Sequence, residues 1–382
     1  MADHVSGLFR PLAWAARLAL QNLFQDKTRL ALSVLAVALS VMLILFLLGL
    51  RTGMFRSAVI YLDNAAGSVV VAPPGVRNTS AGSGQLVSRE TADAVASTPG
   101  VAAVTPVLLM YAIPELHGKK EVIRLTGYDA GPGGGPWKLA EGREPTADDE
   151  VVLDKALAGR HNFTVGDSLE IGGRSLRVVG LSSQTSSWTG TYVFVRKSFV
   201  ESLVLAPGAS SFLLVTPVRG TSTAELIARL QGVPNTNVLL KSQVMANDQE
   251  IMAGIVDQIV VLMVGAAFVV GALVVGMVLY TATVERRPEY GILKAIGARG
   301  GVLYRVIVSQ AFIAAGLGAV AGIVFAYVMG WLVETFRPQF LVPIEPSAIV
   351  ITVGAGLLMA MLGALIPARS VVSLAPAEVF RR

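Results

Sequence analysis

The sequence predicts a membrane α-helical protein with four transmembrane helices in a one-plus-three arrangement and a large α+β extracytoplasmic domain inserted between the first and second spans. Composition is the first reason. Hydrophobic residues make up 53% of the 382 residues and charged residues only 15%, with a mean hydropathy of +0.63, whereas soluble domains carry about 25% charged residues. Patterning is the second reason, because the uncharged stretches are long enough to cross a bilayer. A plain cytosolic enzyme is therefore excluded.

Four uncharged stretches are predicted to be the transmembrane helices, since a span needs roughly 20 apolar residues. They are residues 30–50, 258–284, 306–333 and 347–368. The first exceeds the roughly 7–15 apolar residues of a signal peptide and follows 29 residues, so we expect it to remain as an anchor. Any single stretch has the alternative of a buried core helix, but four together disfavour it.

Lys and Arg residues near the spans predict the orientation, because cytoplasmic loops carry an excess of them. Segments 1–29, 285–305 and 369–382 together hold 12 basic and 5 acidic residues, while 51–257 holds 18 and 19. Both termini and the 285–305 linker are thus predicted to be cytoplasmic, in a multi-pass protein of the cell (inner or plasma) membrane. Residues 51–257 and the short loop 334–346 are then outside. The basic surplus favours anionic lipid headgroups over nucleic acid.

Residues 51–257 mix short β-like runs with amphipathic helical pieces, which is typical of an α+β domain. Gly172-Gly173 between two such runs predicts a tight hairpin. Two glycine-rich patches, 79–84 and 131–136, are expected to be flexible turns. The expected strands are 68–72, 101–111, 121–126, 168–171, 175–179, 192–195 and 212–216, and the expected helices are 88–97 and 223–231. Residues 8–24 of the cytoplasmic N-terminal segment predict an amphipathic helix along the membrane, or one packed on a partner.

Sequence motifs for catalysis or for cofactor and metal binding are missing. No Cys occurs, and the sequence has no G-x-x-x-x-G-K-[ST], G-x-S-x-G or H-E-x-x-H pattern; this excludes thiolate chemistry, and the chain is not itself a P-loop ATPase. His117 and His161 are expected to be surface residues in loops. The run Asp148-Asp149-Glu150 is expected to be a solvated turn rather than a cation site. We therefore expect no catalytic, cofactor-binding or metal residues.

The linker between the second and third spans carries the densest pattern in the chain. Ile292, Leu293 and Ile296 form an apolar stripe, with Glu289 and Lys294 beside it. Pro288 is tolerated in a first turn, and Gly297 stands where a C-terminal cap belongs. This predicts a short helix held under the membrane, and the alternative is a basic loop that only fixes topology.

The predicted spans are rich in small residues and contain no charged residue. Gly318 and Gly322 form a G-x-x-x-G pattern, which allows close helix packing, although glycine is abundant throughout this chain. Other candidate packing positions are Gly271, Gly276, Gly354, Gly356 and Gly363. An ionisable residue inside a span is the usual mark of an ion or proton pathway. The predicted spans contain no Asp, Glu, Lys, Arg or His, so a proton-coupled carrier is disfavoured.

Residues 285–298 resemble the coupling segment of FtsX/MacB-like ABC transporter permeases, E-x-x-x-E-x-G-x-x-x-A-x-G-A, and Tyr290 and Lys294 bring the stretch near the DevC-like branch. The one-plus-three arrangement around a large outer domain is also similar. Pro288 departs from the pattern and leaves the start of the coupling helix open. Further resemblance lies in 99–101, 126–129, 141–143, 150–154, 165–167, 178–181 and 376–379.

The resemblance implies the permease subunit of a mechanotransmission-type ABC exporter. ATP and Mg would be bound by a separate cytosolic ATPase, and a second permease subunit, membrane lipids and an envelope adaptor are the other implied partners. Implied substrates are hydrophobic or amphiphilic: lipids, glycolipids, lipoproteins, peptides or macrolides. The implied ATPase-coupling residues are Glu285, Arg286, Arg287, Glu289, Tyr290, Gly291, Lys294 and Gly297.

Two other functions, a signalling subunit and a membrane-anchored enzyme, are less favoured by the sequence. An FtsX-like signalling subunit would regulate an extracytoplasmic partner such as a cell-wall hydrolase, but those relatives have a smaller outer domain. A membrane-anchored enzyme lacks a catalytic set in this sequence.

Overall fold

The computed structural model describes residues 27–79, 84–129, 131, 133–296 and 300–372. The predicted helix at 8–24, Gly297 and the motif at 376–379 lie outside these residues. The chain forms two compact units. The span unit takes its residues from Met1–Thr52, Asp257–Val333 and Val342–Arg382, and the outer unit from Gly53–Val256 and Glu334–Leu341.

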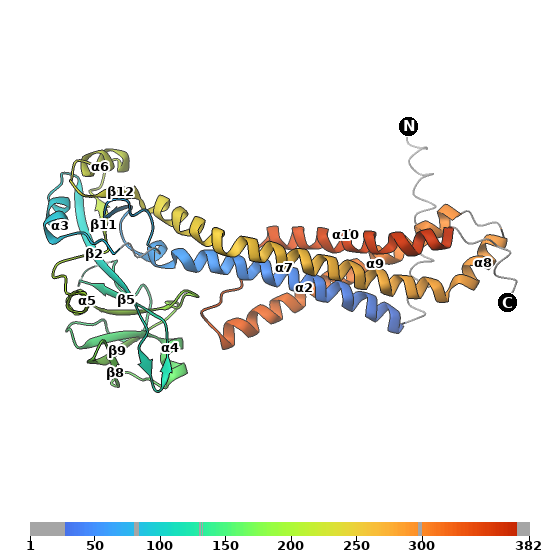
Figure 1. Cartoon of the computed structure of the whole chain (residues 1–382), viewed down its shortest axis with the longest axis horizontal. Coiled ribbons are helices and arrows are strands. Elements are labelled where there is room, and N and C mark those ends of the chain that lie inside the picture. The colour runs from blue at the N-terminus through green and yellow to red at the C-terminus, as the bar shows by residue number, and fades with distance from the viewer. Residues whose placement is uncertain (1–26, 80–83, 130, 132, 297–299, 373–382) are drawn as a thin grey trace. The chain divides into compact units, whose positions relative to one another are not determined.

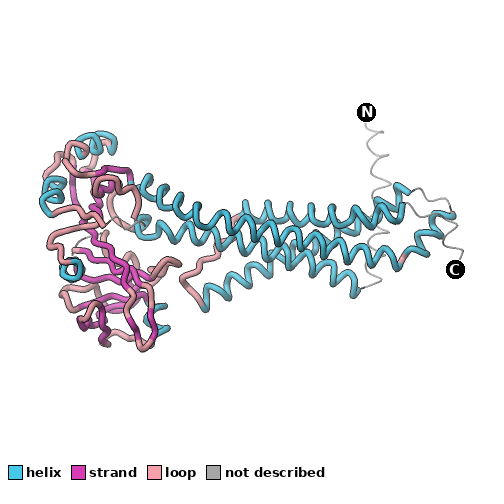
Figure 2. Tube along the Cα trace, viewed as in Figure 1, coloured by secondary structure: helices cyan, strands magenta, loops and turns pink. Residues whose placement is uncertain are grey.

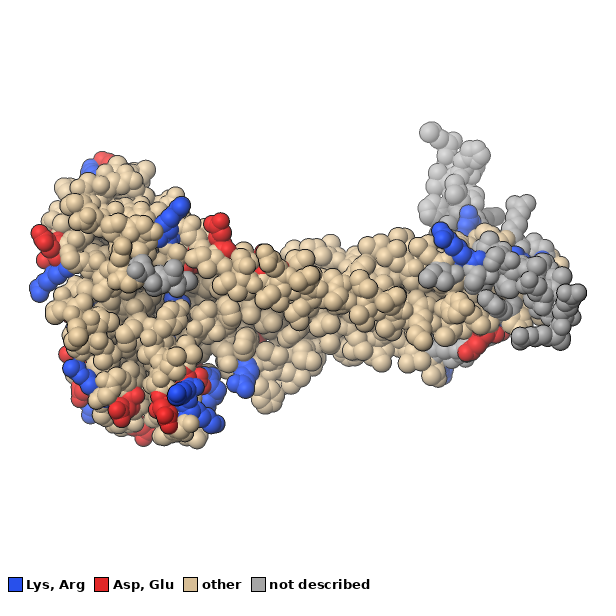
Figure 3. Space-filling model, viewed as in Figure 1, with Lys and Arg blue, Asp and Glu red and all other residues tan. Residues whose placement is uncertain are grey.

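Among the described residues, four helices are long and apolar enough to cross a membrane. They are α2 (Lys27–Asn64), α7 (Lys241–Glu285), α9 (Gly300–Phe336) and α10 (Pro346–Val372) (Figure 1). Each contains one predicted uncharged stretch and extends beyond it, because the helical backbone continues into sequence that is no longer apolar. In Figure 3 the visible middle part of these helices carries no charged side chain, consistent with the uncharged sequence.

Small residues let the span helices approach closely. The span unit has a core of valine, leucine and alanine side chains drawn from all four helices. A Cβ on Gly318 would lie 2.6 Å from Val37 Cβ, and one on Gly322 would lie 2.6 Å from the Ala38 carbonyl oxygen. Any larger side chain at these two positions of α9 would therefore collide with α2.

The outer unit is built on a mixed sheet, with the strands confined to this unit (Figure 2). Strand order is β12-β1-β11-β2-β5-β10-β7-β9-β6, with β8 paired to β9. The β5–β10 and β7–β9 pairs are parallel, and the other pairs are antiparallel. The strands are β1 (Val69–Ala72), β2 (Val101–Ala112), β5 (Ile123–Tyr128), β6 (Leu139–Gly142), β7 (Glu150–Asp154), β8 (Ser168–Ile171), β9 (Arg174–Ser182), β10 (Thr191–Arg196), β11 (Phe212–Pro217) and β12 (Asn237–Leu240), with β3 (Glu115–Leu116) and β4 (Lys119–Lys120) forming a separate hairpin.

Four short helices accompany the sheet: α3 (Arg89–Ala96), α4 (Lys155–His161), α5 (Lys197–Val204) and α6 (Thr223–Leu230). The predicted α+β composition is confirmed, as are all seven predicted strands and both predicted helices, to within a few residues. The Gly172-Gly173 hairpin is confirmed too: Ile171 pairs with Arg174, and both glycines have positive φ angles of 61° and 75°, as a two-residue turn requires.

The described residues of the glycine-rich patch at 131–136 form turns and bends, as predicted, but they also pack against aromatic side chains. Tyr61 donates a hydrogen bond of 2.8 Å to the Gly134 carbonyl. A Cβ on Gly135 would lie 2.5 Å from the Tyr128 ring. Glycine is needed here because aromatic rings pack directly against the backbone, and composition alone does not report such a contact.

The prediction for His161 was wrong. It lies in α4, is 3% exposed, and its Nδ1 and Nε2 are 3.0 Å from the Leu116 carbonyl oxygen and 2.9 Å from Glu121 Oε1. Helix α4 is only seven residues long, which is too short to show a helical period, so no local pattern indicates that this side chain turns inward. His117 is exposed as predicted and stacks on Phe163.

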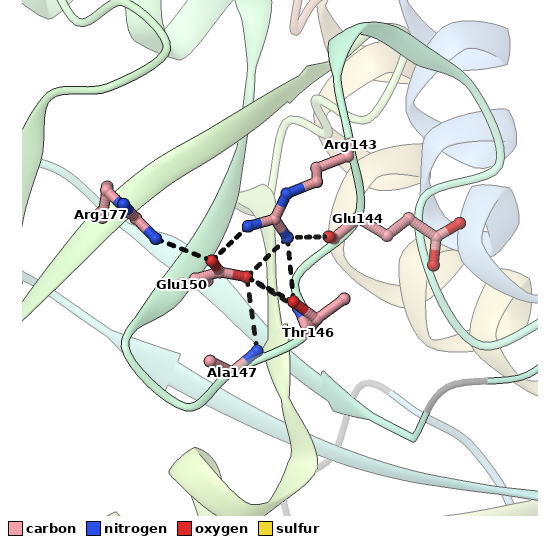
Figure 4. A network of polar contacts seen from close by, with 6 residues as sticks. All are labelled: Arg143, Glu144, Thr146, Ala147, Glu150 and Arg177. Carbon is pink, nitrogen blue, oxygen red and sulfur yellow. Dashed lines mark hydrogen bonds and ion pairs between the residues drawn. The ribbon is translucent and has the colours of Figure 1, made fainter.

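Glu150 was wrongly placed in a solvated turn, although Asp148 and Asp149 are exposed. It begins β7 and is 2% exposed. Its Oε2 accepts from Arg143 Nη1 at 2.7 Å and from the Thr146 backbone N–H at 2.9 Å, while Oε1 accepts from Arg177 Nη2 at 3.0 Å (Figure 4). The hydrogen bonds from Arg143, the largest effect, hold the pKa of Glu150 well below its usual range.

This network predicts acid sensitivity of the outer unit. Because the pKa of Glu150 is lowered by folding, its contribution is fully present above the ordinary value of 4.5 and is lost as the pH falls below it. Glu150→Gln should reduce the free energy of unfolding at pH 7 by about 1.5–3 kcal/mol and flatten its dependence between pH 5 and about 3. Urea unfolding of the detergent-solubilised chain measures both. Glu170→Gln, at an exposed strand position, is the control, and an identical loss in both variants would contradict this account.

The glycine contacts predict a position-specific steric effect. Gly318→Val should destabilise the span unit by about 1–3 kcal/mol, the usual cost of overpacking. Gly316→Val in the same helix should be tolerated, since a Cβ there meets no atom of the described chain within 4 Å. Thermal stability in detergent, followed by size-exclusion recovery, compares the two. Equal losses would show that α9 does not pack on α2 through Gly318.

Candidate functional site

The linker between α7 and α9 contains the helix predicted from its sequence. This helix, α8, spans Arg287–Ala295. Pro288 lies in its first turn, where a missing backbone N–H breaks no helical hydrogen bond. The Tyr290 N–H donates to the Arg286 carbonyl at 3.1 Å. The start that Pro288 left open is thus at Arg287, and the predicted cap at Gly297 lies outside the described residues.

Tyr290 fixes α8 to the span unit. Its side chain is 3% exposed and packs with Leu303 and Ile307 of α9 and with Ala368 of α10. Burial raises the pKa of the Tyr290 phenol. Gly291 beside it is also buried. These two predicted coupling residues are therefore enclosed within the span unit and hold the helix in place.

The apolar stripe of α8 lies on a different face from Tyr290. Positions 289, 292, 293 and 296 follow the i, i+3, i+4, i+7 spacing of one helical face. Ile292 is 50% exposed, Leu293 45% and Ile296 80%. We expected a short helix held under the membrane, and contact of this stripe with a membrane stays a prediction. Within the described part of the chain the stripe is largely exposed, and Tyr290 attaches α8 to the span unit.

Charged residues surround this stripe. Glu289 is exposed on the same face, Glu285 is exposed at the end of α7, and Arg286 and Lys294 are partly buried. For Arg287 the structure describes the backbone only. The site is therefore an anchored helix that presents three large apolar side chains with an acidic residue among them. Exposed apolar patches with polar rims are typical of protein or membrane contact sites.

One contact in the span unit was missed by the sequence reasoning. Arg51 of α2 makes a two-point ion pair with Asp257 of α7, with Nε–Oδ1 2.6 Å and Nη2–Oδ2 3.0 Å. Arg51 directly follows the first uncharged stretch, and Asp257 directly precedes the second. Their opposite charges at the same predicted membrane boundary were the available signal. Two-point pairing fixes geometry as well as distance, so it ties α2 to α7.

Metal binding has no candidate in the described part of the chain. No group of three or more His, Asp or Glu side chains there is arranged to hold an ion.

Comparison with known families accounts for both halves of the sequence. Residues 30–233, more than half of the chain, match the MacB-like periplasmic core domain, and residues 261–376 match the FtsX-like permease C-terminal family. The chain belongs to the FtsX/MacB-like family of ABC transporter permeases. It is thus a membrane protein with four spans and an extracytoplasmic domain of the MacB type, and a permease of this kind works with an ATPase subunit.

Individual proteins are similar to the chain to different extents. An uncharacterized ABC transporter permease of Mycobacterium tuberculosis is 26% identical over 374 residues, covering 95% of this chain and 98% of the relative. The macrolide export ATP-binding/permease protein MacB of Hyphomonas neptunium is 22% identical over 404 residues, covering 96% of this chain and 60% of the relative. The crystal structure of the periplasmic region of MacB from Actinobacillus actinomycetemcomitans aligns with 49% of this chain and 94% of its own, at 15% identity and a TM-score of 0.37.

The anchoring role of Tyr290 is open to a direct test. Tyr290→Ala should speed amide hydrogen exchange of residues 287–295 at least about tenfold, because burying a large apolar side chain contributes about 1.5–3 kcal/mol. Tyr290→Phe keeps the ring and should exchange as the unaltered protein does. Mass spectrometry of the chain in nanodiscs gives the rates. Equal exchange in the Ala and Phe variants would mean that α8 is not held by this side chain.

Proposed function

We propose that this permease is the transmembrane subunit of a mechanotransmission-type ABC exporter. It couples ATP hydrolysis by a separate cytosolic ATPase to movement of its extracytoplasmic domain, and it acts on hydrophobic or amphiphilic substrates such as lipids, lipoproteins, peptides or macrolide-like compounds. A second permease subunit, identical or related, completes the membrane part, and an envelope adaptor joins those assemblies that cross a cell envelope. ATP and Mg²⁺ are bound by the ATPase.

The observation that carries this proposal is the uncovered apolar stripe on α8. A short helix with apolar residues at i, i+3, i+4 spacing is suited to lie in a groove of another protein. The ATPase subunit offers such a partner on the side of the membrane where the basic linker is expected. Glu289 and Lys294 flank the stripe and supply charge pairing at its rim, which favours one docking orientation.

A series of side-chain contacts connects α8 to all four span helices. Tyr290 joins α8 to α9 and α10, and Gly318 and Gly322 bring α9 against α2. The Arg51–Asp257 pair then links α2 to α7. Each step is a direct contact within the span unit, so a displacement of α8 strains all four helices. The uncharged middle of the spans offers no binding groups for an ion pathway, which supports mechanical transmission.

The distribution of Lys and Arg supports the proposed orientation in the cell membrane. Both termini and α8 face the cytoplasm in this proposal, because the Lys and Arg surplus lies in their segments and cytoplasmic loops carry that surplus. The outer unit then lies beyond the cell membrane. The name of the MacB relative records macrolide export, in keeping with the proposed substrate class.

The α8 interface predicts a loss of ATPase association. Leu293→Asp, and separately the charge reversals Glu289→Lys and Lys294→Glu, should weaken co-purification of the ATPase, the first at least about tenfold, since a central apolar contact is worth about 2 kcal/mol or more. Leu205→Asp alters a residue that is 87% exposed in the outer unit and should leave association unchanged. Quantitative pull-down from nanodiscs measures the effect, and full association of Leu293→Asp would remove α8 from the interface.

An exporter and a signalling subunit are distinguished by which molecules stimulate the ATPase activity of the complex. ATPase activity of the complex in nanodiscs should rise when lipids or macrolide-like drugs are titrated in. Stimulation by a cell-wall hydrolase alone, with no response to any amphiphile, would instead favour the signalling role.

A further inference from the structure

A cavity of about 540 Å³ lies in the outer unit, and all of its lining residues belong to that unit. This volume falls in the range of about 300–1,000 Å³ that is typical of small-molecule sites. Its wall combines apolar and polar side chains. The apolar lining includes Ile60, Trp137 and Leu341, and the polar lining includes Asp154, Lys155 and Gln184.

The apolar side of the cavity is held rigidly. The Trp137 indole makes edge-to-face contacts with Tyr61, Tyr192 and Phe194, at ring-centroid distances of 6.3, 5.8 and 6.0 Å. Those three rings belong to the buried core of the outer unit. Trp137 itself is only partly buried, so it presents fixed aromatic surface to the cavity.

Another part of the cavity wall is braced by a buried carboxylate. Asp154 accepts hydrogen bonds from the Ala156 N–H at 2.9 Å and from the Ser186 hydroxyl at 2.8 Å. It also accepts from the Thr185 N–H at 3.1 Å and from its hydroxyl at 2.7 Å. Its oxygens are thus occupied by the protein, and they fix the 183–187 loop to the start of α4. Polar capacity for a ligand comes instead from the exposed side chains Lys155 and Gln184.

A third part of the cavity wall is formed by residues 334–341, which directly follow a predicted span. Glu334 follows the uncharged stretch 306–333 without an intervening residue, and 334–341 belongs to the outer unit. Pro338 and Leu341 of this segment are among the apolar lining residues. The cavity is therefore bounded by a segment that begins at the outer membrane surface.

We propose that this cavity binds one amphiphilic molecule taken from the outer leaflet. Its apolar part lies on Trp137, Ile60 and Leu341, and its polar part is near Lys155 and Gln184. A cavity of about 540 Å³ is in the range that takes a drug-sized molecule, such as a single short chain or a headgroup with its first methylenes. This inference rests on the proposed function, for which it names the substrate class and the site.

Fluorescence quenching tests the site in the full chain in nanodiscs. Trp14, Trp188 and Trp331 are replaced by Phe so that Trp137 is the only reporter, and lysophosphatidylcholine brominated on its acyl chain is titrated in. Saturable quenching of Trp137 is expected. Ala156→Phe, which fills the cavity from α4, should weaken the apparent affinity at least about tenfold, while Ala94→Phe on the exposed face of α3 should leave it unchanged.

Quenching that rises linearly without saturation, or that is equal in Ala156→Phe and Ala94→Phe, would overturn the site. If the triple Phe background does not fold, a diazirine-bearing lysolipid is crosslinked to the chain with its own tryptophans. Labelled peptides should then contain Trp137 or residues 334–341, and labelling confined to the spans would overturn the proposal. ATPase co-purification of Ala156→Phe should remain normal, so failure of the cavity is distinguishable from failure of the coupling role.

Discussion

The bilayer is the constraint on which the rest of this permease depends. A chain inside hydrocarbon must satisfy its backbone internally and has no hydrophobic driving force between its helices. The spans meet the first demand as long helices and the second through glycine and alanine contacts, as where Gly318 lies against Val37. Polar contacts that specify geometry are therefore found at the ends of the uncharged stretches, where Arg51 pairs with Asp257.

The two faces of α8 have different surroundings: one packs on the span unit, and the other is exposed. Tyr290 uses the same interior physics as the spans, since it is buried among apolar side chains of α9 and α10. The stripe at Ile292, Leu293 and Ile296 stays 45–80% exposed in the described chain. In the proposed coupling role, the attachment through Tyr290 is what passes a displacement of α8 to α9 and α10.

The outer unit keeps its shape through buried polar groups as well as its apolar core. Glu150 joins the start of β7 to Arg143 and Arg177, and Asp154 at the end of β7 joins α4 to the loop that follows β9. Both ends of one central strand are thus fixed by carboxylates whose oxygens the protein itself occupies. A wall held by such buried hydrogen bonds is suited to a cavity of fixed shape.

The sequence by itself determined the four spans, the α+β outer domain, the Gly172-Gly173 hairpin and the helix at 287–295, because each rests on local periodicity, turn chemistry or the absence of charge. Only the tertiary structure decided which way side chains face. His161 and Glu150 turn inward, Tyr290 packs against α9 and α10, and Arg51 meets Asp257 across 206 positions of sequence. The direction in which a side chain faces depends on contacts between segments far apart in the chain, and the local pattern of each segment does not specify those contacts.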